Sequence, residues 1–378
     1  MIHSKIATGI SRAGTVIVGR TGHLYHSRAV YWLDGSPSPT VQTIAPLPGG
    51  NKNNFQAVSG NGIIAVGSSE TTNSGTHAFS WKSGRSPEVL DLGVPDNYER
   101  SYASGVNNDG TVIVGASTRT GNYGTPTRWR ETEGNHNITK ELLSLPTGYH
   151  SGIATDANSN GTLIVGYCRS GHIFDGYDHA IYWPEGTTTG VQQLLCLGEH
   201  SSAHARAVSD NGNVIVGYSS GPYHLNNRRA VRWIRDPSTG NFNISDLMVC
   251  PEGSNNCTSM ARGVNHDGTV IVGTRTRRVV VSDGLFRRIY DAFIWTANPT
   301  PLVQTLIDVT AENPFSRAQD VTTRTDGTNI SVGASSDIPP DEDLPMQDLA
   351  VRWIGRLGVN NLLFPQEPSF QHIQEGSL

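Results

Sequence analysis

A short stretch framed by glycines recurs seven times along the chain and constrains the fold more than any other feature. Each copy opens with Asn, Asp or, once, Ala before a glycine, continues with mostly apolar residues and ends in a second glycine. The copies span residues 13–19, 61–67, 109–115, 160–166, 211–217, 267–273 and 326–333. The closing glycines are 48, 48, 51, 51, 56 and 60 residues apart. This period is typical of a propeller or another array of supersecondary units.

One tryptophan follows each copy. The seven tryptophans of the chain are Trp32, Trp81, Trp129, Trp183, Trp233, Trp295 and Trp353. An indole buries about 150–250 Å², so one indole per repeat indicates a large core element of fixed shape. We expect these residues to be structural and to pack between neighbouring sheets.

The strands within one unit can be identified in the fifth repeat. Residues 205–209 alternate between apolar and polar side chains, Asn211-Gly212 forms a turn, and residues 213–217 are mostly apolar, as in a buried strand. Asn or Asp precedes the first glycine in six of the seven copies, which predicts a type I′ hairpin turn with positive φ at both central residues. The closing glycine predicts a close approach between backbones. Two further strands are expected at residues 229–233 and 243–248.

Composition and period together favour one ring. Glycine is abundant at 42 residues, charged residues make up only 16 %, and helical periodicity is scarce, which excludes solenoids built from helix pairs. We therefore predict an all-β fold, a seven-bladed β-propeller with four-stranded antiparallel blades, in a single domain at residues 1–364. The expected blades span residues 5–47, 55–93, 102–145, 152–198, 204–249, 259–309 and 316–364, and residues 365–378 form a C-terminal tail.

The repeats resemble the HAF extracellular repeat family, which is named for a His-Ala-Phe tripeptide. That tripeptide stands at residues 77–79 between AVSGNGIIAVG and VLDLG, and variants occur at residues 179–181 and 291–293. The resemblance covers residues 5 to about 364 and departs from the pattern at Pro126, where alanine is expected. It implies surface-exposed binding in a bacterial or viral protein and supplies no catalytic residue.

Charge and hydropathy exclude several classes of partner. The net charge of -5 gives no basic field for nucleic acid. The chain has no apolar run of about 18 residues for membrane insertion and no signal-peptide pattern at its start. Together with the resemblance, this predicts a protein that is extracellular, on a cell surface or part of a virion. Cys250 and Cys257 could clip one loop in an oxidising compartment or remain free thiols.

Long segments rich in Tyr, His and Arg follow the second strand of several repeats. In a four-stranded meander these segments and the connections between blades share one end of the ring, opposite the Asn/Asp-Gly turns. We expect this long-loop face to bind a protein or a glycan; the alternative is that long loops simply tolerate polar residues. The candidate binding residues are His23, Tyr25, His26, Tyr98 with the adjoining Glu99, Tyr123, Phe174, Tyr177, Tyr223, Arg277 and Arg278.

The loop at residues 274–291 is arginine-rich and contains a segment that could extend as a hairpin, whereas the equivalent loop of the next repeat, residues 337–348, is acidic. Opposite charges at this distance would largely cancel each other's field. We therefore expect charge pairing between the two loops rather than a basic docking site for an acidic partner.

Several short motifs match reactive or metal-binding patterns without the context that such chemistry needs. Residues 217–221 match G-x-S-x-G but end a hairpin strand, whereas a nucleophile elbow joins a strand to a helix. The turns at 107–110 and 265–268 lack the full oxygen ligand set of a calcium loop. The histidines near residues 23–26 and 172–179 lack a metal-ligand spacing. We predict no catalytic residue, no metal site and no cofactor.

The leading functional hypothesis is a non-catalytic propeller that displays loops for recognition, on a bacterial surface or as a virion accessory protein. The alternative is a propeller hydrolase or lyase acting on polysaccharide, because residues from distant blades can converge at an axis without any linear motif. A third hypothesis is a rigid spacer in a larger assembly. Convergence of His, Tyr, Arg and carboxylates with shifted acidity at one central site would favour the enzyme.

Overall fold

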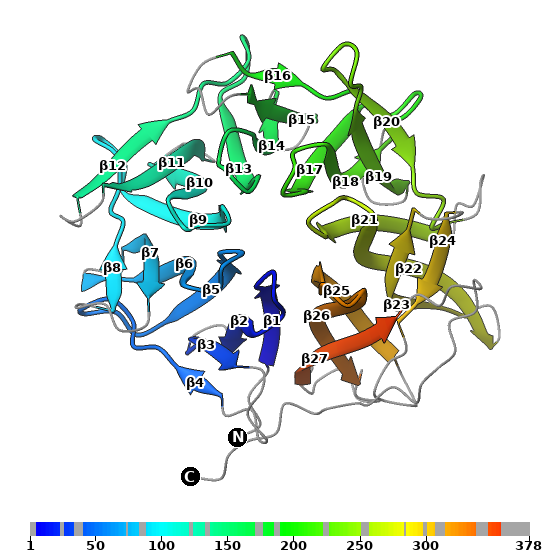
Figure 1. Cartoon of the computed structure of the whole chain (residues 1–378), viewed down its shortest axis with the longest axis horizontal. Helices are drawn as coiled ribbons and strands as arrows, with labels where there is room; N and C mark the ends of the chain where they lie inside the picture. Colours follow the sequence, from blue (N-terminus) through cyan, green and yellow to red (C-terminus); the bar gives the residue numbers. More distant parts are fainter. Residues whose placement is uncertain are drawn as a thin grey trace.

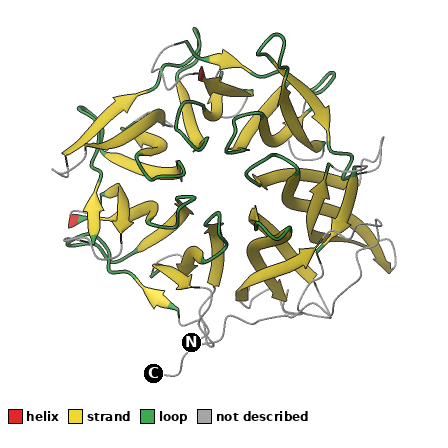
Figure 2. Ribbon diagram, viewed as in Figure 1, coloured by secondary structure: helices red, strands yellow, loops and turns green. Residues whose placement is uncertain are grey.

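A computed structural model describes residues 5–22, 26–33, 41–72, 75–82, 88–120, 124–132, 137–170, 177–184, 190–221, 227–250, 257–282, 285–297, 301–306, 314–337 and 347–356. Nearly all regular structure in these ranges is β-strand (Figure 2), so the all-β fold class is confirmed. No helix within these ranges has the length and hydrophobicity needed to cross a membrane. The expected tail at residues 365–378 and the expected last strand at residues 359–364 lie outside the described residues.

Five antiparallel sheets contain four strands each, paired in chain order. The first two are β1 (Lys5–Ile10), β2 (Val16–Thr21), β3 (Arg28–Leu33) and β4 (Gln42–Thr43), then β5 (Asn53–Val58), β6 (Ile64–Glu70), β7 (Thr76–Lys82) and β8 (Val89–Asp91). The next two are β9 (Arg100–Val106), β10 (Val112–Thr118), β11 (Thr125–Thr132) and β12 (Asn137–Leu142), then β13 (Ser151–Ala157), β14 (Ile164–Arg169), β15 (Asp178–Trp183) and β16 (Gln192–Gln193). The fifth is β17 (Ser202–Val208), β18 (Val214–Ser220), β19 (Arg228–Arg235) and β20 (Phe242–Asp246).

A further, seven-stranded sheet consists of two antiparallel meanders. One contains β21 (Cys257–Val264), β22 (Val270–Ser282), β23 (Leu285–Thr296) and β24 (Leu302–Thr305), and the other contains β25 (Pro314–Thr323), β26 (Thr328–Asp337) and β27 (Gln347–Arg356). Among the described residues, one parallel bridge, between Tyr290 and Phe315, joins them. Figure 1 shows that the sheets surround a common axis with the first strand of each meander innermost. This is the arrangement of a β-propeller.

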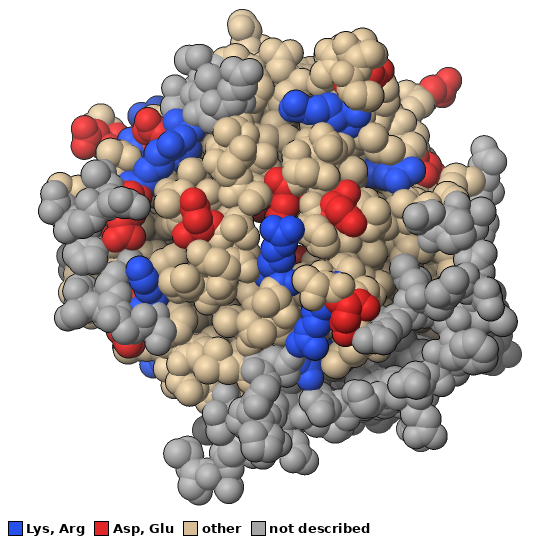
Figure 3. Space-filling view, in the orientation of Figure 1, with Lys and Arg blue, Asp and Glu red and all other residues tan. Residues whose placement is uncertain are grey.

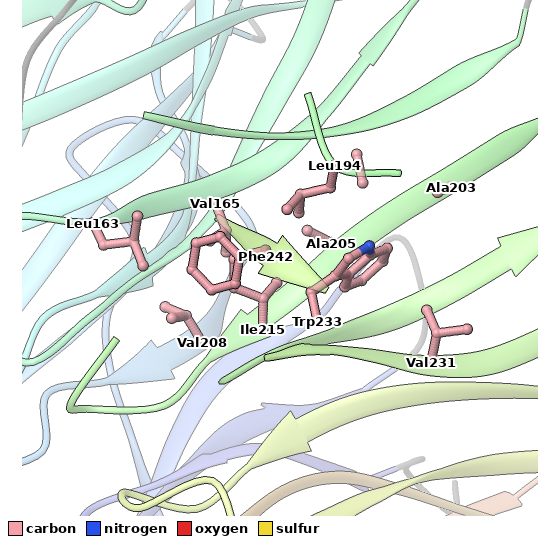
Figure 4. Close-up of a cluster of buried hydrophobic side chains, with 11 residues drawn as sticks. Leu163, Val165, Leu194, Ala203, Ala205, Val208, Ile215, Val231, Trp233 and Phe242 are labelled. Atoms are coloured by element: carbon pink, nitrogen blue, oxygen red, sulfur yellow. The ribbon is translucent and has the colours of Figure 1, made fainter. Parts of the chain in front are cut away.

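The tryptophans occupy the layers between neighbouring sheets. All seven are buried, with exposed fractions of 0–8 %, and each belongs to an apolar cluster that includes residues of the preceding sheet or meander. In Figure 4, Trp233 of β19 clusters with Val165 of β14 and with Leu163 just before it. Trp32 clusters with Ile330 of β26. The last meander therefore packs against the first sheet, and the ring closes.

The closing glycines lie where two inner strands come closest, as predicted. A Cβ at Gly217 would overlap the carbonyl oxygen of His204, and the other six closing glycines face the equivalent carbonyl of their own innermost strand. Opposite each closing glycine, the innermost strand contains a β-bulge with one extra residue. These bulge residues are Thr8, Gln56, Ser104, Thr155, Arg206, Arg262 and Gln319. All seven are polar or charged.

The prediction of type I′ turns is wrong. Only the glycine of each Asn/Asp-Gly pair has positive φ, because Asn97 and Met248 are the only described non-glycine residues with positive φ. In the β9–β10 turn the amide of Gly110 donates to the carbonyl of Asn107 at 3.3 Å. The Asp109 carboxylate accepts hydrogen bonds from the amide and hydroxyl of Thr111 at 3.0 and 2.6 Å. The turn is therefore longer than a two-residue type I′ turn, and Asn or Asp is favoured because its side chain caps the turn.

We predict that Trp233→Ala lowers the free energy of unfolding by about 3–5 kcal/mol, because removing a buried indole leaves a cavity between two sheets. Ile234→Ala is the matched control, since Ile234 follows in the same strand but is 36 % exposed; we expect it to change stability by less than about 1 kcal/mol. Urea unfolding followed by circular dichroism measures both. Equal losses in the two variants would contradict an inter-sheet role for the indole.

Candidate binding site

The structure distributes the predicted binding residues over several parts of the ring. His23, Tyr25, Tyr123, Phe174 and Tyr223 lie outside the described residues. The remaining predicted residues fall in four separate places. His26 is exposed before β3, Tyr98 and Glu99 lie in the β8–β9 connection, Tyr177 is exposed before β15, and Arg277 and Arg278 lie in β22. The described members therefore do not form one site.

Tyr98 and Glu99 lie at the rim between the second and third sheets. The Tyr98 hydroxyl donates to Thr125 Oγ1 at 2.9 Å. Glu99 lines a groove of about 750 Å³. Across this groove, His77 Nδ1 lies 2.9 Å from a carboxylate oxygen of Asp91. The first residue of the HAF tripeptide thus pairs with the aspartate of the VLDLG segment, and this contact joins β7 to the end of β8.

The arginine-rich loop of the sixth repeat forms the expected hairpin, because β22 and β23 remain paired along its length. Arg277 Nε lies 2.6 Å from Asp291 Oδ2, and Arg275 Nη2 contacts the same oxygen at 3.1 Å. Arg277 is therefore paired within its own hairpin, where it shares the Asp291 carboxylate with Arg275. The expected partners in the acidic loop, at residues 337–348, have side chains outside the described part.

A different group of side chains comes together between the fourth and fifth sheets, near the axis. His204 of β17 lies between two tyrosines, with ring centroids 4.0 Å from Tyr167 of β14 and 4.6 Å from Tyr218 of β18. His204 and Tyr218 are cross-strand partners. Tyr167 and Tyr218 each follow the closing glycine of their repeat. We call these three residues the Tyr-His-Tyr stack.

Asp178 fixes the orientation of the stacked histidine. Its Oδ2 lies 2.7 Å from His204 Nε2, and Arg169 donates to both carboxylate oxygens at 2.7 and 2.9 Å. Burial works to raise the pKa of Asp178, but the hydrogen bonds from His204 and Arg169 outweigh it and hold this pKa well below its usual range. Burial also lowers the pKa of His204 to about 4. The imidazole is therefore neutral at pH 7.

Three arginines lie beside the Tyr-His-Tyr stack: Arg206, Arg228 and Arg262, which we call the axial arginine cluster. The guanidinium carbons of Arg206 and Arg228 lie 5.7 and 5.0 Å from the Tyr218 ring centroid. Burial, and then the charges of Arg206 and Arg317, lower the pKa of Arg262 to about 10. Arg206 and Arg262 are bulge residues, and Arg228 begins β19 directly after a long loop. The cluster thus lies towards the long-loop end of the axis.

Arg206, Arg228 and Arg262 form no ion pair with a carboxylate among the residues that the structure describes. Among the described residues, Arg262 donates to two neutral oxygens, Thr274 Oγ1 and Gln319 Oε1, each at 3.3 Å. Within the part of the chain that the structure describes, Arg206 and Arg228 form no ion pair, and the buried Nε atom of each has no acceptor. A concentration of positive charge with unused donors suits an anionic ligand.

The opposite end of the axis is held by paired groups. Figure 3 shows acidic and basic side chains meeting at the centre of the face seen in Figure 1. Arg12, in the β1–β2 turn, lies 3.4 Å from Asp210 in the β17–β18 turn. Figure 1 places these two hairpins on opposite sides of the axis, so the ion pair spans it. Both side chains are partly exposed, and the pair contributes little stability.

Two buried aspartates lock neighbouring sheets together beside the axis. Asp156 Oδ2 accepts a hydrogen bond from the amide of Val208 in the next sheet at 2.9 Å. Asp320 Oδ2 accepts one from the amide of Ile10 at 3.0 Å. Burial raises the pKa of Asp156 to about 7 and that of Asp320 to about 6. Backbone amides of the neighbouring sheet donate hydrogen bonds to both carboxyls. The raised pKa values therefore belong to groups with a structural role.

The site was missed in the sequence because its members lie within strands rather than in the loops that the prediction singled out. Two positions in the sequence could have indicated the site. At the bulge position, arginine replaces a smaller polar residue in only two repeats. The residue after the closing glycine is tyrosine in only two repeats. In the described residues, no group of three or more His, Cys, Asp and Glu side chains has the geometry to hold a metal ion.

Comparison with known proteins gives the fold alone. No family model matches the chain, and no curated protein matches it. It is similar in structure to one of two prolyl endopeptidases described together (TM-score 0.53, 11 % identity, 93 % of this chain and 55 % of that one). It is also similar to a post-proline cleaving enzyme from Rickettsia typhi (0.51, 10 %, 90 % and 50 %). A putative TolB from Agrobacterium tumefaciens matches at 0.42, with 14 % identity over 65 % of this chain and 81 % of that one. The chain thus spans about half the length of the two peptidases.

We predict that Asp156 and Asp320 make stability fall as the pH rises from about 4 to 7. Their folded-state pKa values lie above the ordinary value of 3.8, so the folded state favours the protonated carboxyls and loses that advantage as they ionise. The stability difference between the wild type and an Asp156→Asn/Asp320→Asn variant should therefore shrink across this window in thermal unfolding.

Asp236→Asn is the control for this pH series. Hydrogen bonds from Ser238 lower the pKa of this exposed carboxyl, so its substitution should leave the pH dependence between 4 and 7 unchanged. If the difference between the wild type and the double variant stays constant over this range, the two axial carboxyls are ionised throughout it.

Proposed function

We propose that this protein is a seven-bladed β-propeller that recognises a glycan or a protein at the long-loop end of its axis and has no catalytic activity. The β21–β24 and β25–β27 meanders count as separate blades in this proposal, because one bridge joins them and Trp353 belongs to the cluster between them. The ring then forms one domain, in keeping with the seven repeats of the sequence.

The single observation that carries the proposal is the axial arginine cluster. Its unpaired guanidinium groups can bind an anion, but they cannot act as a general base at neutral pH because they stay protonated. The neighbouring titratable groups are occupied. Asp178 is bound by Arg169 and His204, and the two carboxyls with pKa values near neutrality accept amide hydrogen bonds from the next sheet. The residue types expected at an active site thus come together here. Their acid–base groups, however, are already hydrogen-bonded within the protein.

A location on a bacterial surface or in a virion, and membership of the HAF repeat family, remain part of this proposal. Cys250 and Cys257 form a disulfide, whereas Cys168 and Cys196 are free thiols. Disulfides persist mainly in oxidising compartments. This bond supports an exported or extracellular setting.

The proposed function is tested by measuring binding and turnover on the same samples. The full chain is applied to a glycan array and incubated with polysaccharides, glycosides and esters whose products are followed by mass spectrometry. We expect specific retention on the array and no product. Turnover of any polysaccharide at a rate proportional to protein concentration would replace recognition by the hydrolase or lyase alternative.

We predict that the protein purified from an oxidising compartment contains two reactive thiols under denaturing conditions, and four after reduction. A Cys250→Ser/Cys257→Ser variant should lose about 2–3 kcal/mol of stability, because the disulfide restricts a short loop in the unfolded chain. Thiol titration and urea unfolding measure the two effects. Four thiols before reduction would remove the support that this bond gives to an exported location.

A further inference from the structure

We propose that the axial arginine cluster and the Tyr-His-Tyr stack form a subsite for an acidic sugar, a ligand that carries hydroxyl groups beside a carboxylate. This inference rests on the proposed function and adds the chemical class of the ligand. It is carried by three features of the described residues: unneutralised positive charge, unused guanidinium donors and an unused imidazole acceptor.

The first step concerns charge. Arg262 interacts electrostatically with Arg206 and Arg228, and none of the three forms an ion pair with a carboxylate among the described residues. Clustered cations inside a protein repel one another and lose part of their hydration, which is costly unless an anion joins them. Asp178, the carboxylate hydrogen-bonded to His204, already forms a bidentate pair with Arg169. An anion must therefore come from outside the described group of side chains.

The second step concerns donor geometry. The guanidinium groups of Arg206 and Arg228 both lie over the Tyr218 ring, and the buried Nε of each is without an acceptor. A planar guanidinium presents paired donors that match the two oxygens of a carboxylate. Arg262 adds a third guanidinium from the neighbouring sheet. This arrangement suits one carboxylate better than a neutral ligand.

The third step concerns the histidine. His204 Nε2 is hydrogen-bonded to the ionised Asp178 and therefore carries the proton of the neutral imidazole, which leaves Nδ1 as an acceptor. Nδ1 is buried and has no hydrogen-bond partner, and His204 as a whole is only 7 % exposed. A ligand that carries a hydroxyl donor as well as a negative charge would satisfy both this acceptor and the arginines. An acidic sugar supplies both, whereas acetate supplies only the charge.

The experiment is calorimetric titration of the full chain with D-glucuronate, D-galacturonate, N-acetylneuraminate, D-glucose and acetate. We expect at least one of the three acidic sugars to bind with a dissociation constant of about 1 mM or below. Glucose should not bind measurably, and acetate should bind more weakly than the best acidic sugar. The affinity should fall as salt is added, because the contact is largely electrostatic.

Variants separate the subsite from general charge effects. Arg206→Gln/Arg262→Gln should weaken binding of the best acidic sugar by about 10-fold or more, the loss expected for hydrogen bonds to a charged group. Arg12→Gln is the matched control, because it removes an arginine at the other end of the axis, and should leave the affinity unchanged. His204→Phe keeps an aromatic ring in the stack but removes the acceptor. It should weaken sugar binding and leave acetate binding unaltered.

Three outcomes would overturn the inference. They are the absence of binding by all three acidic sugars to folded wild type, equal affinity for glucose, and an equal effect of Arg12→Gln and Arg206→Gln/Arg262→Gln. The glycan array keeps this failure distinct from failure of the proposed function. Array binding that survives in Arg206→Gln/Arg262→Gln would leave recognition intact and reject the acidic-sugar subsite. Acidic-sugar binding accompanied by turnover would retain the subsite and reject the non-catalytic role.

Discussion

The close approach between each closing glycine and the carbonyl group of its innermost strand is the constraint on which the rest of the structure depends. Strands that converge on one axis have little room there, and a side chain at Gly217 would overlap the backbone at His204. The first strand responds with a bulge opposite the glycine, which leaves one residue outside the regular pairing. That extra residue is released from the alternation that governs the rest of the strand. It therefore accepts polar and charged side chains in every repeat.

The bulges also determine how the sheets are joined at their narrow ends. Thr155 Oγ1 donates to the carbonyl of Ala205 in the next sheet at 3.0 Å, and Asp156, directly after it, accepts from the amide of Val208. Farther from the axis the gap between sheets is filled by indoles. Polar contacts thus join the sheets near the axis, and hydrophobic burial joins them farther out. The two kinds of contact together fix each sheet at both its inner edge and its middle.

The sequence predicted the structural features that the repeats share and missed the axial site, whose residues occur in only some repeats. The period, the strand order, the hairpin of β22–β23 and the close approach at the closing glycines follow from residues that recur or alternate. The turn type was wrong because Asn and Asp favour two structures before glycine, a left-handed backbone or a side-chain cap, and the composition is the same for both. The axial site was out of reach for a different reason. A bulge shifts the register by one residue, and contact between Tyr167 and His204 depends on the alignment of separate sheets, which no periodicity within one repeat records.

The axis is electrically asymmetric, and this asymmetry bears on how a ligand is selected. At the turn end the cation of Arg12 is paired with Asp210. Towards the long-loop end Arg206, Arg228 and Arg262 have no such partner. The chain as a whole carries a net charge of -5, so an acidic ligand meets a generally unfavourable field until it reaches this local concentration of arginines. Within a Debye length of about 8–10 Å the local charges dominate, and binding then depends on whether the ligand also offers a donor to His204. Charge in this arrangement determines where an acid can bind, and the buried imidazole acceptor determines which acids remain bound.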